Sequence, residues 1–125
     1  MPKGAVTTKE IAPPVGPFSP AVESDGSLYV SGQVAQDPVN GTLIDDDVAA
    51  QTEQILRNAA AVLRAGGKSF SDVVKVGVFL TDMTDFQAMN AVYARHFQTP
   101  YPARTTVAVS ALPLGAKVEM DFLAR

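Results

Sequence analysis

The segment Val73–Thr81, which reads V-V-K-V-G-V-F-L-T, restricts the possible folds of this chain more than any other. It is rich in β-branched residues and almost entirely apolar, which predicts a β-strand. A nearly continuous apolar run of this length is typical of a strand that is buried on both faces. Any fold built around this strand must therefore cover the sheet on both sides.

A long helix is predicted before this strand, over residues 46–65. The aspartates at positions 45–47 provide an N-cap and suit the positive end of the helix dipole, and Gly66-Gly67 ends the helix. The apolar side that this helix would bury recurs at helical spacing. It consists of Val48, Thr52, Ile55, Ala59, Val62 and Leu63.

A second helix is predicted after the strand, over residues 85–97. Thr84 and Gln87 have the spacing of a capping box, which would begin this helix. Its apolar side consists of Phe86, Met89, Tyr93 and Phe97, with Asn90 at the edge. The single histidine, His96, comes late in the helix, where a cation is favoured by the dipole. As a catalytic base His96 would need a partner, and the sequence does not identify one.

The N-terminal part predicts further strands. Asp25-Gly26 is a hairpin signal between residues 21–24 and 27–34, and a short edge strand is expected around Val6–Ile11. Ser31-Gly32 interrupts the second hairpin strand, and a glycine there often marks a bulge or a close approach of a ligand. The proline-rich segment 12–20 is either a stiff binding loop or a plain connector.

Two final strands are predicted within residues 102–124, and each carries one charged residue of interest. Arg104 lies near the start of the first strand and Glu119 lies in the second. If the two strands pair or lie close in one sheet, both side chains can be directed into a common space. A guanidinium there can bind a carboxylate through two hydrogen bonds, and a carboxylate can move protons. The alternative is an ordinary surface ion pair.

The predicted element order is β-β-α-β-α-β-β, which indicates one α+β domain over residues 1–125 with two helices packed on one sheet. Two helices cover only one face of such a sheet, whereas the strand at 73–81 requires cover on both. We therefore expect a symmetric oligomer to cover the second face, with Glu119 and Asp121 in or beside the subunit interface.

Composition excludes several kinds of site. The chain has 13 acidic and 10 basic residues, a formal net charge of −3, and no run of lysines or arginines, so nucleic-acid binding is not expected. The absence of cysteine and the presence of one histidine exclude disulfides, thiolate nucleophiles and His-rich metal sites. No apolar signal region or span of about 18 apolar residues occurs, which predicts a cytoplasmic protein without a membrane segment.

Seven short motifs occur in the order found in one known family. They are G-P-F-S at 16–19, S-G-Q at 31–33, D-V-A-A-Q-T at 47–52, V-F-L-T-D-M at 78–83, F-Q-A-M-N-A-V-Y at 86–93, P-A-R at 102–104 and V-E-M at 118–120. Over nearly its full length the chain resembles the RidA/YjgF (reactive intermediate deaminase) family. The resemblance implies a chorismate-mutase-like fold with a mixed sheet, and a homotrimer with a central barrel and ligand clefts between subunits.

The resemblance also implies a reaction, the hydrolysis of 2-imino acids such as 2-iminobutanoate and 2-iminopropanoate to 2-keto acids and ammonia, without metal or cofactor. Arg104 would bind the substrate carboxylate and Glu119 would handle the attacking water. Ser31, Gly32 and Asn90 would contact or support the substrate in the cleft.

Two positions depart from the family pattern. Phe18 stands where most members have tyrosine, and Thr106 stands where many have cysteine. The first change removes a hydroxyl from the cleft and leaves rate or substrate preference open. Two other functions therefore remain alternatives: a trimer that binds small carboxylates or a protein partner without catalysis, and, with less support, an endoribonuclease or translation inhibitor.

Overall fold

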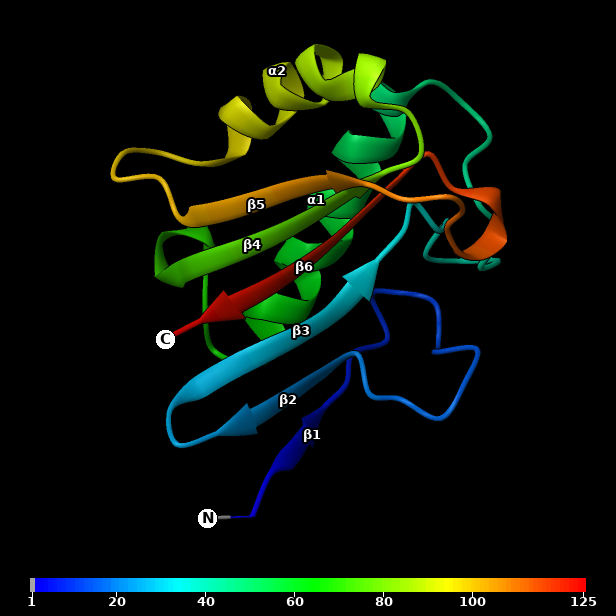
Figure 1. The fold of residues 1–125 in the computed structure, drawn as a ribbon. Helices are drawn as coiled ribbons and strands as arrows, with labels where there is room; N and C mark the ends of the chain where they lie inside the picture. Colours follow the sequence, from blue (N-terminus) through cyan, green and yellow to red (C-terminus); the bar gives the residue numbers. More distant parts are fainter. Residues whose placement is uncertain (1) are drawn as a thin grey trace.

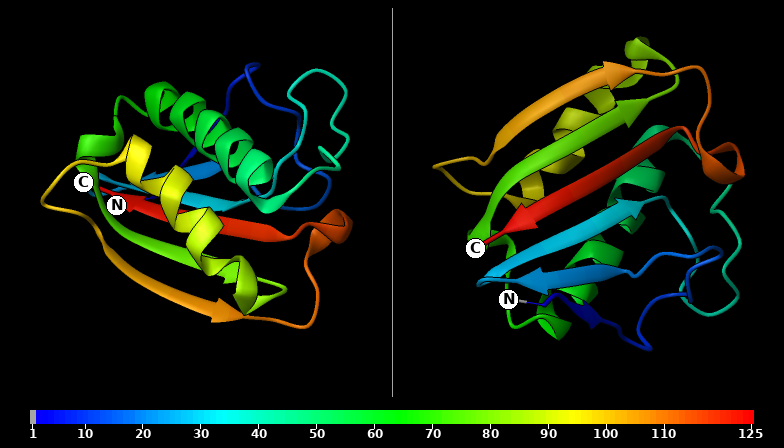
Figure 2. Two further views of the ribbon diagram at one scale, coloured as in Figure 1. Left: turned by 90° about the horizontal axis from the view of Figure 1, so that it is seen from above. Right: turned by 60° about the horizontal axis from the view of Figure 1, so that its bottom comes forward.

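In the computed structural model, which describes residues 2–125, six strands form one mixed sheet and two helices lie on one side of it (Figures 1 and 2). The strands are β1 (Gly4–Val6), β2 (Ala21–Ser24), β3 (Ser27–Gln33), β4 (Val73–Leu80), β5 (Ala103–Ala108) and β6 (Val118–Ala124), and the helices are α1 (Val48–Ala65) and α2 (Phe86–His96). The order across the sheet is β1-β2-β3-β6-β4-β5. Only β4 and β5 are parallel. The predicted α+β architecture is therefore confirmed.

Helix α1 ends at Ala65 as predicted and begins at Val48, directly after the predicted capping aspartates. The Asp47 carboxylate accepts a hydrogen bond from the backbone N–H of Ala50 at 2.8 Å, which caps the helix. At the other end the N–H of Lys68 donates to the carbonyl of Leu63 at 2.8 Å, and Gly67 has a positive φ of 75°. This is the Schellman arrangement, in which glycine is favoured because it has no Cβ.

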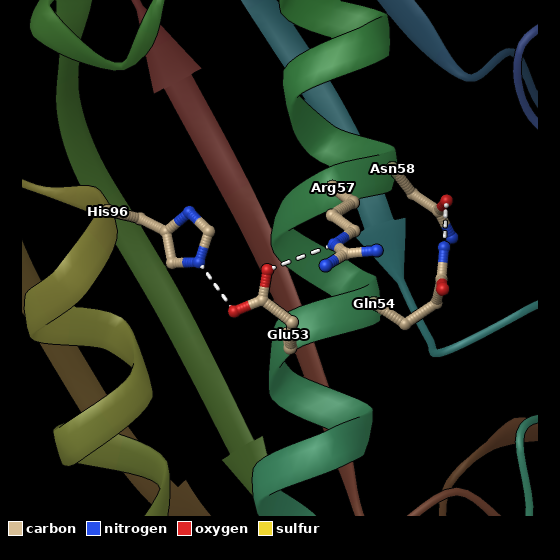
Figure 3. A network of polar contacts seen from close by, with 5 residues as sticks. All are labelled: Glu53, Gln54, Arg57, Asn58 and His96. Atoms are coloured by element: carbon tan, nitrogen blue, oxygen red, sulfur yellow. Dashed lines mark hydrogen bonds and ion pairs between the residues drawn. The ribbon is translucent and has the colours of Figure 1, made fainter.

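The core lies between the two helices and the sheet. All members of the predicted apolar side of α1 are buried, and so are Met89 and Tyr93 of α2 and Phe97 directly after it, whereas Phe86 is only partly buried. At the surface of this layer, His96 of α2 contacts Glu53 of α1, with 2.9 Å between Nε2 and Oε1 (Figure 3). Arg57 holds the other Glu53 oxygen at 3.1 Å. The two helices are thus joined by a polar contact as well as by packing.

The second face of the sheet is open in a single chain. Along β6, Val118, Met120 and Phe122 are buried under the helices, and the alternate residues face the other side and are half-buried. Exposed apolar side chains occur on the strands as well, including Val74 at 45% and Val107 at 39% exposure. Residues 2–125 supply no second layer over this face, so the expected cover on the second side of β4 stays a prediction about the assembly.

Two local predictions are wrong. The edge strand β1 is Gly4–Val6 and not Val6–Ile11, because its partner β2 begins at Ala21, opposite Val6, and pairing ends there. Thr84 and Gln87 form no capping box. Instead, the Asp82 carboxylate accepts hydrogen bonds from the Thr84 N–H at 2.9 Å and hydroxyl at 2.7 Å. Thr84 is thereby held in a 3₁₀ turn, Met83–Asp85, that precedes α2.

Neither helix found in residues 2–125 has both the length and the apolar character that crossing a bilayer requires.

Candidate functional site

The residues predicted to form the site are divided between two cavities. Phe18, Ser31, Gly32 and Glu119 line a cavity of about 420 Å³. Arg104 lines a second cavity of about 310 Å³, together with Asn90, Tyr93, Ala94, Tyr101 and Pro102. No residue lines both cavities. A single chain therefore holds the candidate residues in two separate groups.

The position of β4 explains this division. The two strands that carry Arg104 and Glu119 do not pair, because β4 lies between them. Arg104 is opposite Val76 of β4, and Glu119 is opposite Phe79. Side chains alternate along a strand, so Val76 and Phe79 point to opposite faces, and so do the residues beside them. Val76 is fully buried under the helices, which places Arg104 on the helix side and Glu119 on the open side.

The Glu119 cavity is shaped by a bulge in β3. Val30 pairs with Phe122 and Gln33 pairs with Met120, so Ser31 and Gly32 together stand opposite a single β6 residue. The predicted bulge at Ser31-Gly32 is therefore confirmed. The Ser31 hydroxyl donates to the carbonyl of Ser19 at 2.6 Å, and this ties the proline-rich loop to the bulge.

Gly32 allows the Glu119 carboxylate to lie directly over the backbone. A Cβ added to Gly32 would overlap that carboxylate and come within 2.9 Å of Glu119 Cδ. Only a glycine here leaves the carboxylate in this place, where it is directed into the cavity beside the bulge.

The Glu119 carboxylate is electrostatically unusual. It is half-buried and makes no hydrogen bond or ion pair with any residue from 2 to 125. Burial raises the pKa of Glu119, and the negative charge of Asp121 on the same face raises it further. Asp121 is fixed there by a hydrogen bond of 3.0 Å that its Oδ1 accepts from the N–H of Gly77. A carboxylate with a raised pKa and no partner is suited to proton transfer.

The Arg104 cavity presents a cation on an aromatic surface. The Arg104 guanidinium carbon is 4.7 Å from the centre of the Tyr93 ring and 5.6 Å from that of Phe86. No carboxylate of residues 2–125 lies within ion-pair distance of it. The alternative of a surface ion pair with Glu119 is therefore wrong. The guanidinium keeps hydrogen-bond donors free for an anionic ligand.

Two buried polar atoms beside Arg104 also lack partners within the described chain. They are Oδ1 of Asn90 and the hydroxyl of Tyr93. Buried polar atoms without hydrogen bonds are rare, and here they border a cavity that can receive a ligand or a second protein surface. Burial raises the pKa of Tyr93, so its hydroxyl remains protonated at neutral pH. The sequence pattern assigned Tyr93 only to the apolar side of α2. The one sequence feature that could have indicated a role in the site is its hydroxyl, a polar group on that apolar side.

His96 belongs to neither cavity. Its partner, which the sequence did not identify, is Glu53, and its ring also packs against Phe70 with 5.9 Å between ring centres.

Thr106 is half-buried in β5, two residues after Arg104 and on the same face. Within residues 2–125, no three His, Asp or Glu side chains cluster as metal ligands would.

The comparisons with known proteins agree with this architecture. A sequence profile of the family described as Endoribonuclease L-PSP matches residues 8–125. The chain belongs to this family, RidA/YjgF. Among RidA/YjgF relatives, the 2-iminobutanoate/2-iminopropanoate deaminase of Homo sapiens is 38% identical over 119 residues, which cover 95% of this chain and 87% of that protein.

Crystal structures of RidA/YjgF proteins have the same fold. RidA from the Antarctic bacterium Psychrobacter sp. PAMC 21119 superposes with a TM-score of 0.93 at 39% identity, over 97% of this chain and 98% of that one. E. coli TdcF with bound serine superposes with a TM-score of 0.90 at 33% identity, over 97% of each chain. The family match over residues 8–125 includes every residue that lines the two cavities.

Proposed function

We propose that this RidA/YjgF protein hydrolyses 2-imino acids to 2-keto acids and ammonia. Two side chains support this best, because each lacks an ion-pair partner within residues 2–125 and they carry opposite charges. They are the guanidinium of Arg104 and the carboxylate of Glu119, whose pKa is raised. A relative that is 38% identical is a 2-iminobutanoate/2-iminopropanoate deaminase, and both groups are suited to the hydrolysis of such imino acids.

In the proposed mechanism, Arg104 binds the carboxylate of R–C(=NH)–COO⁻ through two N–H···O hydrogen bonds and holds the C=N carbon in place. The Glu119 carboxylate accepts a proton from a water molecule as the water oxygen bonds to that carbon, and Glu119 passes this proton to the imine nitrogen, which gives the carbinolamine R–C(OH)(NH₂)–COO⁻. Glu119 then accepts the hydroxyl proton and transfers it to the amino group. The C–N bond breaks as the C=O bond forms, the products are R–C(=O)–COO⁻ and NH₃, and Glu119 is again a carboxylate.

The separation of the Arg104 cavity from the Glu119 cavity leads to a proposal about the oligomeric assembly. Because Arg104 and Glu119 lie on opposite faces of the sheet, one chain does not bring them to one substrate. We propose a homotrimer in which Arg104 of one subunit meets Glu119 of its neighbour in each of three clefts. The exposed Val107 and Tyr29, the second at 51% exposure, lie on the open face and favour an additional layer over it. Light scattering should give three times the chain mass, and a monomer at micromolar concentration would contradict the proposal.

The activity is tested by generating an imino acid in place. An L-amino-acid oxidase and its substrate are incubated with the protein, and loss of the imine is followed against the spontaneous reaction. The wild-type protein should accelerate imine loss, and Glu119→Gln at the same concentration should not. Equal rates with wild-type protein, Glu119→Gln protein and buffer would overturn the proposed function.

A binding protein without catalysis is the second candidate, and Phe18 favours it. Phe18 is 51% exposed at the Glu119 cavity and has no hydroxyl to orient water or substrate. If a hydroxyl there aids turnover, Phe18→Tyr should raise the rate or change the substrate preference without altering thermal stability. RNA cleavage has less support, because the net charge is −3 and His96 is engaged with Glu53.

A further inference from the structure

We infer that the Glu119 cavity receives the side chain of the substrate and selects 2-imino acids with branched or aromatic apolar side chains over 2-iminopropanoate. Leu114 and Val15 are the specificity-determining residues in this inference. It rests on the proposed imine hydrolysis and adds the substrate class and the residues that set it.

The cavity wall is apolar apart from a few polar groups. Its lining consists of Ile11, Ala12, Pro14, Val15, Phe18, Pro20, Ser31, Gly32, Gln33, Val34, Gln36, Pro113, Leu114 and Glu119. Three of the side chains that could offer hydrogen bonds are already engaged, since Ser31 donates to Ser19 O, Gln33 to Ser31 O and Gln36 to Gly41 O. The remaining charged group is Glu119, so an occupant of the cavity is apolar except where it meets this carboxylate.

The charge distribution shows which part of the substrate enters. The imine carbon carries three substituents: the nitrogen, the carboxylate and the side chain. The lining of this cavity contains no lysine or arginine, and its only charge is negative, so it repels the substrate carboxylate. The carboxylate must bind at a cation elsewhere, which is Arg104 in the proposed mechanism. With Glu119 at the reacting carbon, the side chain is left to occupy the apolar space.

Leu114 is an unusual residue at its position. Its φ of 60° and ψ of 14° lie in the left-handed region, which favours glycine or asparagine. Its side chain is 51% exposed, so it is not fixed by the core, yet it lines the cavity. Val15 is 77% exposed and lines the same cavity from the proline-rich loop. Two exposed apolar side chains on separate loops thus form a wall that the fold itself does not require.

The size of the cavity favours a larger side chain. Its volume of about 420 Å³ is within the usual range for small-molecule sites. The single methyl group of 2-iminopropanoate would leave most of the apolar wall without contacts. Each additional methylene placed in an apolar pocket typically changes kcat/KM by about tenfold or more.

The experiment compares two imino acids generated by the same oxidase. These are 4-methyl-2-iminopentanoate from leucine and 2-iminopropanoate from alanine, each corrected for spontaneous hydrolysis. The ratio of kcat/KM should favour the leucine-derived substrate by about tenfold or more. Leu114→Asn, which suits the left-handed backbone, and Val15→Thr, which keeps the side-chain shape, should each lower this ratio. Val39→Thr is the matched control, because Val39 is 93% exposed and outside the cavity; its ratio should equal that of the wild type.

A binding measurement separates this inference from the proposed function. The keto acids 4-methyl-2-oxopentanoate and pyruvate have the shapes of the two products, and calorimetry on the wild-type assembly compares their affinities. Tighter binding of 4-methyl-2-oxopentanoate, weakened by Leu114→Asn, is expected and would support the pocket even if no imine were hydrolysed. Two results would overturn the inference and leave the proposed function standing. One is imine hydrolysis with an equal or greater preference for 2-iminopropanoate. The other is a ratio of kcat/KM for the two imino acids that Leu114→Asn leaves unchanged.

Discussion

Arg104 and Glu119 lie on opposite faces of one sheet, with β4 between the strands that carry them. Neither side chain neutralises the other, and each borders a cavity of its own. This relationship explains why both groups are free to act on a ligand. It also implies that a site which uses both must be completed by a second copy of the chain.

Removing the Arg104 guanidinium should abolish imine hydrolysis while the assembly persists. A hydrogen bond to a charged group typically contributes about 1.5–3 kcal/mol, so Arg104→Ala should weaken substrate binding by about one to two powers of ten, and loss of orientation should lower the rate further. Arg104→Lys should rescue little, because an ammonium lacks the planar fork. Arg95→Ala, at an exposed arginine of α2, is the control. Parental rates in Arg104→Ala would contradict the assigned site.

Neutralising Asp121 should shift the pH dependence of activity. Burial and then the Asp121 charge raise the pKa of Glu119, so Asp121→Asn should lower that pKa and move the acidic limb of kcat/KM to lower pH. Burial remains, so the limb should stay above the ordinary glutamate value of 4.5. The asparagine Oδ1 can still accept from Gly77. Asp45→Asn, in an exposed loop, should leave the profile in place. An unshifted limb in Asp121→Asn would show that the two carboxylates are not coupled.

A methyl group at Gly32 should displace the Glu119 carboxylate. Its Cβ would overlap the end of a flexible side chain rather than the backbone, so the fold should persist while the carboxylate moves. A displacement of about 1 Å at a catalytic group can cost about 100-fold in rate. Gly4→Ala, where a Cβ meets nothing within 4 Å, is the matched control. The two variants should have similar thermal stability and very different turnover; similar turnover would mean that Glu119 needs no fixed position.

The Glu53–His96 contact between the helices should stabilise the fold in a pH-dependent way. The hydrogen bond with His96 is the main cause that lowers the pKa of Glu53 below its ordinary value of 4.5. The contribution of this contact to the free energy of unfolding is therefore complete above about pH 4.5, and it disappears as the pH falls through the lowered pKa of Glu53. Glu53→Gln should cost about 0.2–1 kcal/mol of unfolding free energy at pH 7 and progressively less as the pH falls below 4.5, measured by chemical denaturation. Glu23→Gln, on the exposed side of β2, serves as control; a cost that does not change with pH would contradict the assignment.

Local patterns in the sequence predicted the elements and their faces well. The apolar side predicted for α1 is the side that is buried, and Ser31-Gly32 marked the bulge. Asp47 predicted the start of α1 because capping depends on residues only three positions apart. Such features are determined by neighbours along the chain, so the sequence carries them directly.

Contacts between residues that are far apart in the sequence could not be predicted in this way. The insertion of β4 between β5 and β6 is a long-range pairing, and no local pattern in residues 102–124 encodes it. For the same reason, the separation of Arg104 from Glu119, the partnership of Glu53 with His96, and the apolar wall formed by Val15 and Leu114 emerged only from the structure. Each depends on residues far apart in sequence that become neighbours through the fold.

Subunit complementation tests the central claim most directly. Arg104→Ala and Glu119→Gln are each expected to be inactive alone. If a site combines Arg104 of one subunit with Glu119 of its neighbour, unfolding and refolding an equal mixture should restore about a quarter of the sites, because random assembly joins the two intact residues at that frequency. Activity near a quarter of the wild-type value is the predicted result. A mixed assembly, verified by mass, that remains as inactive as its parents would contradict a site shared between subunits.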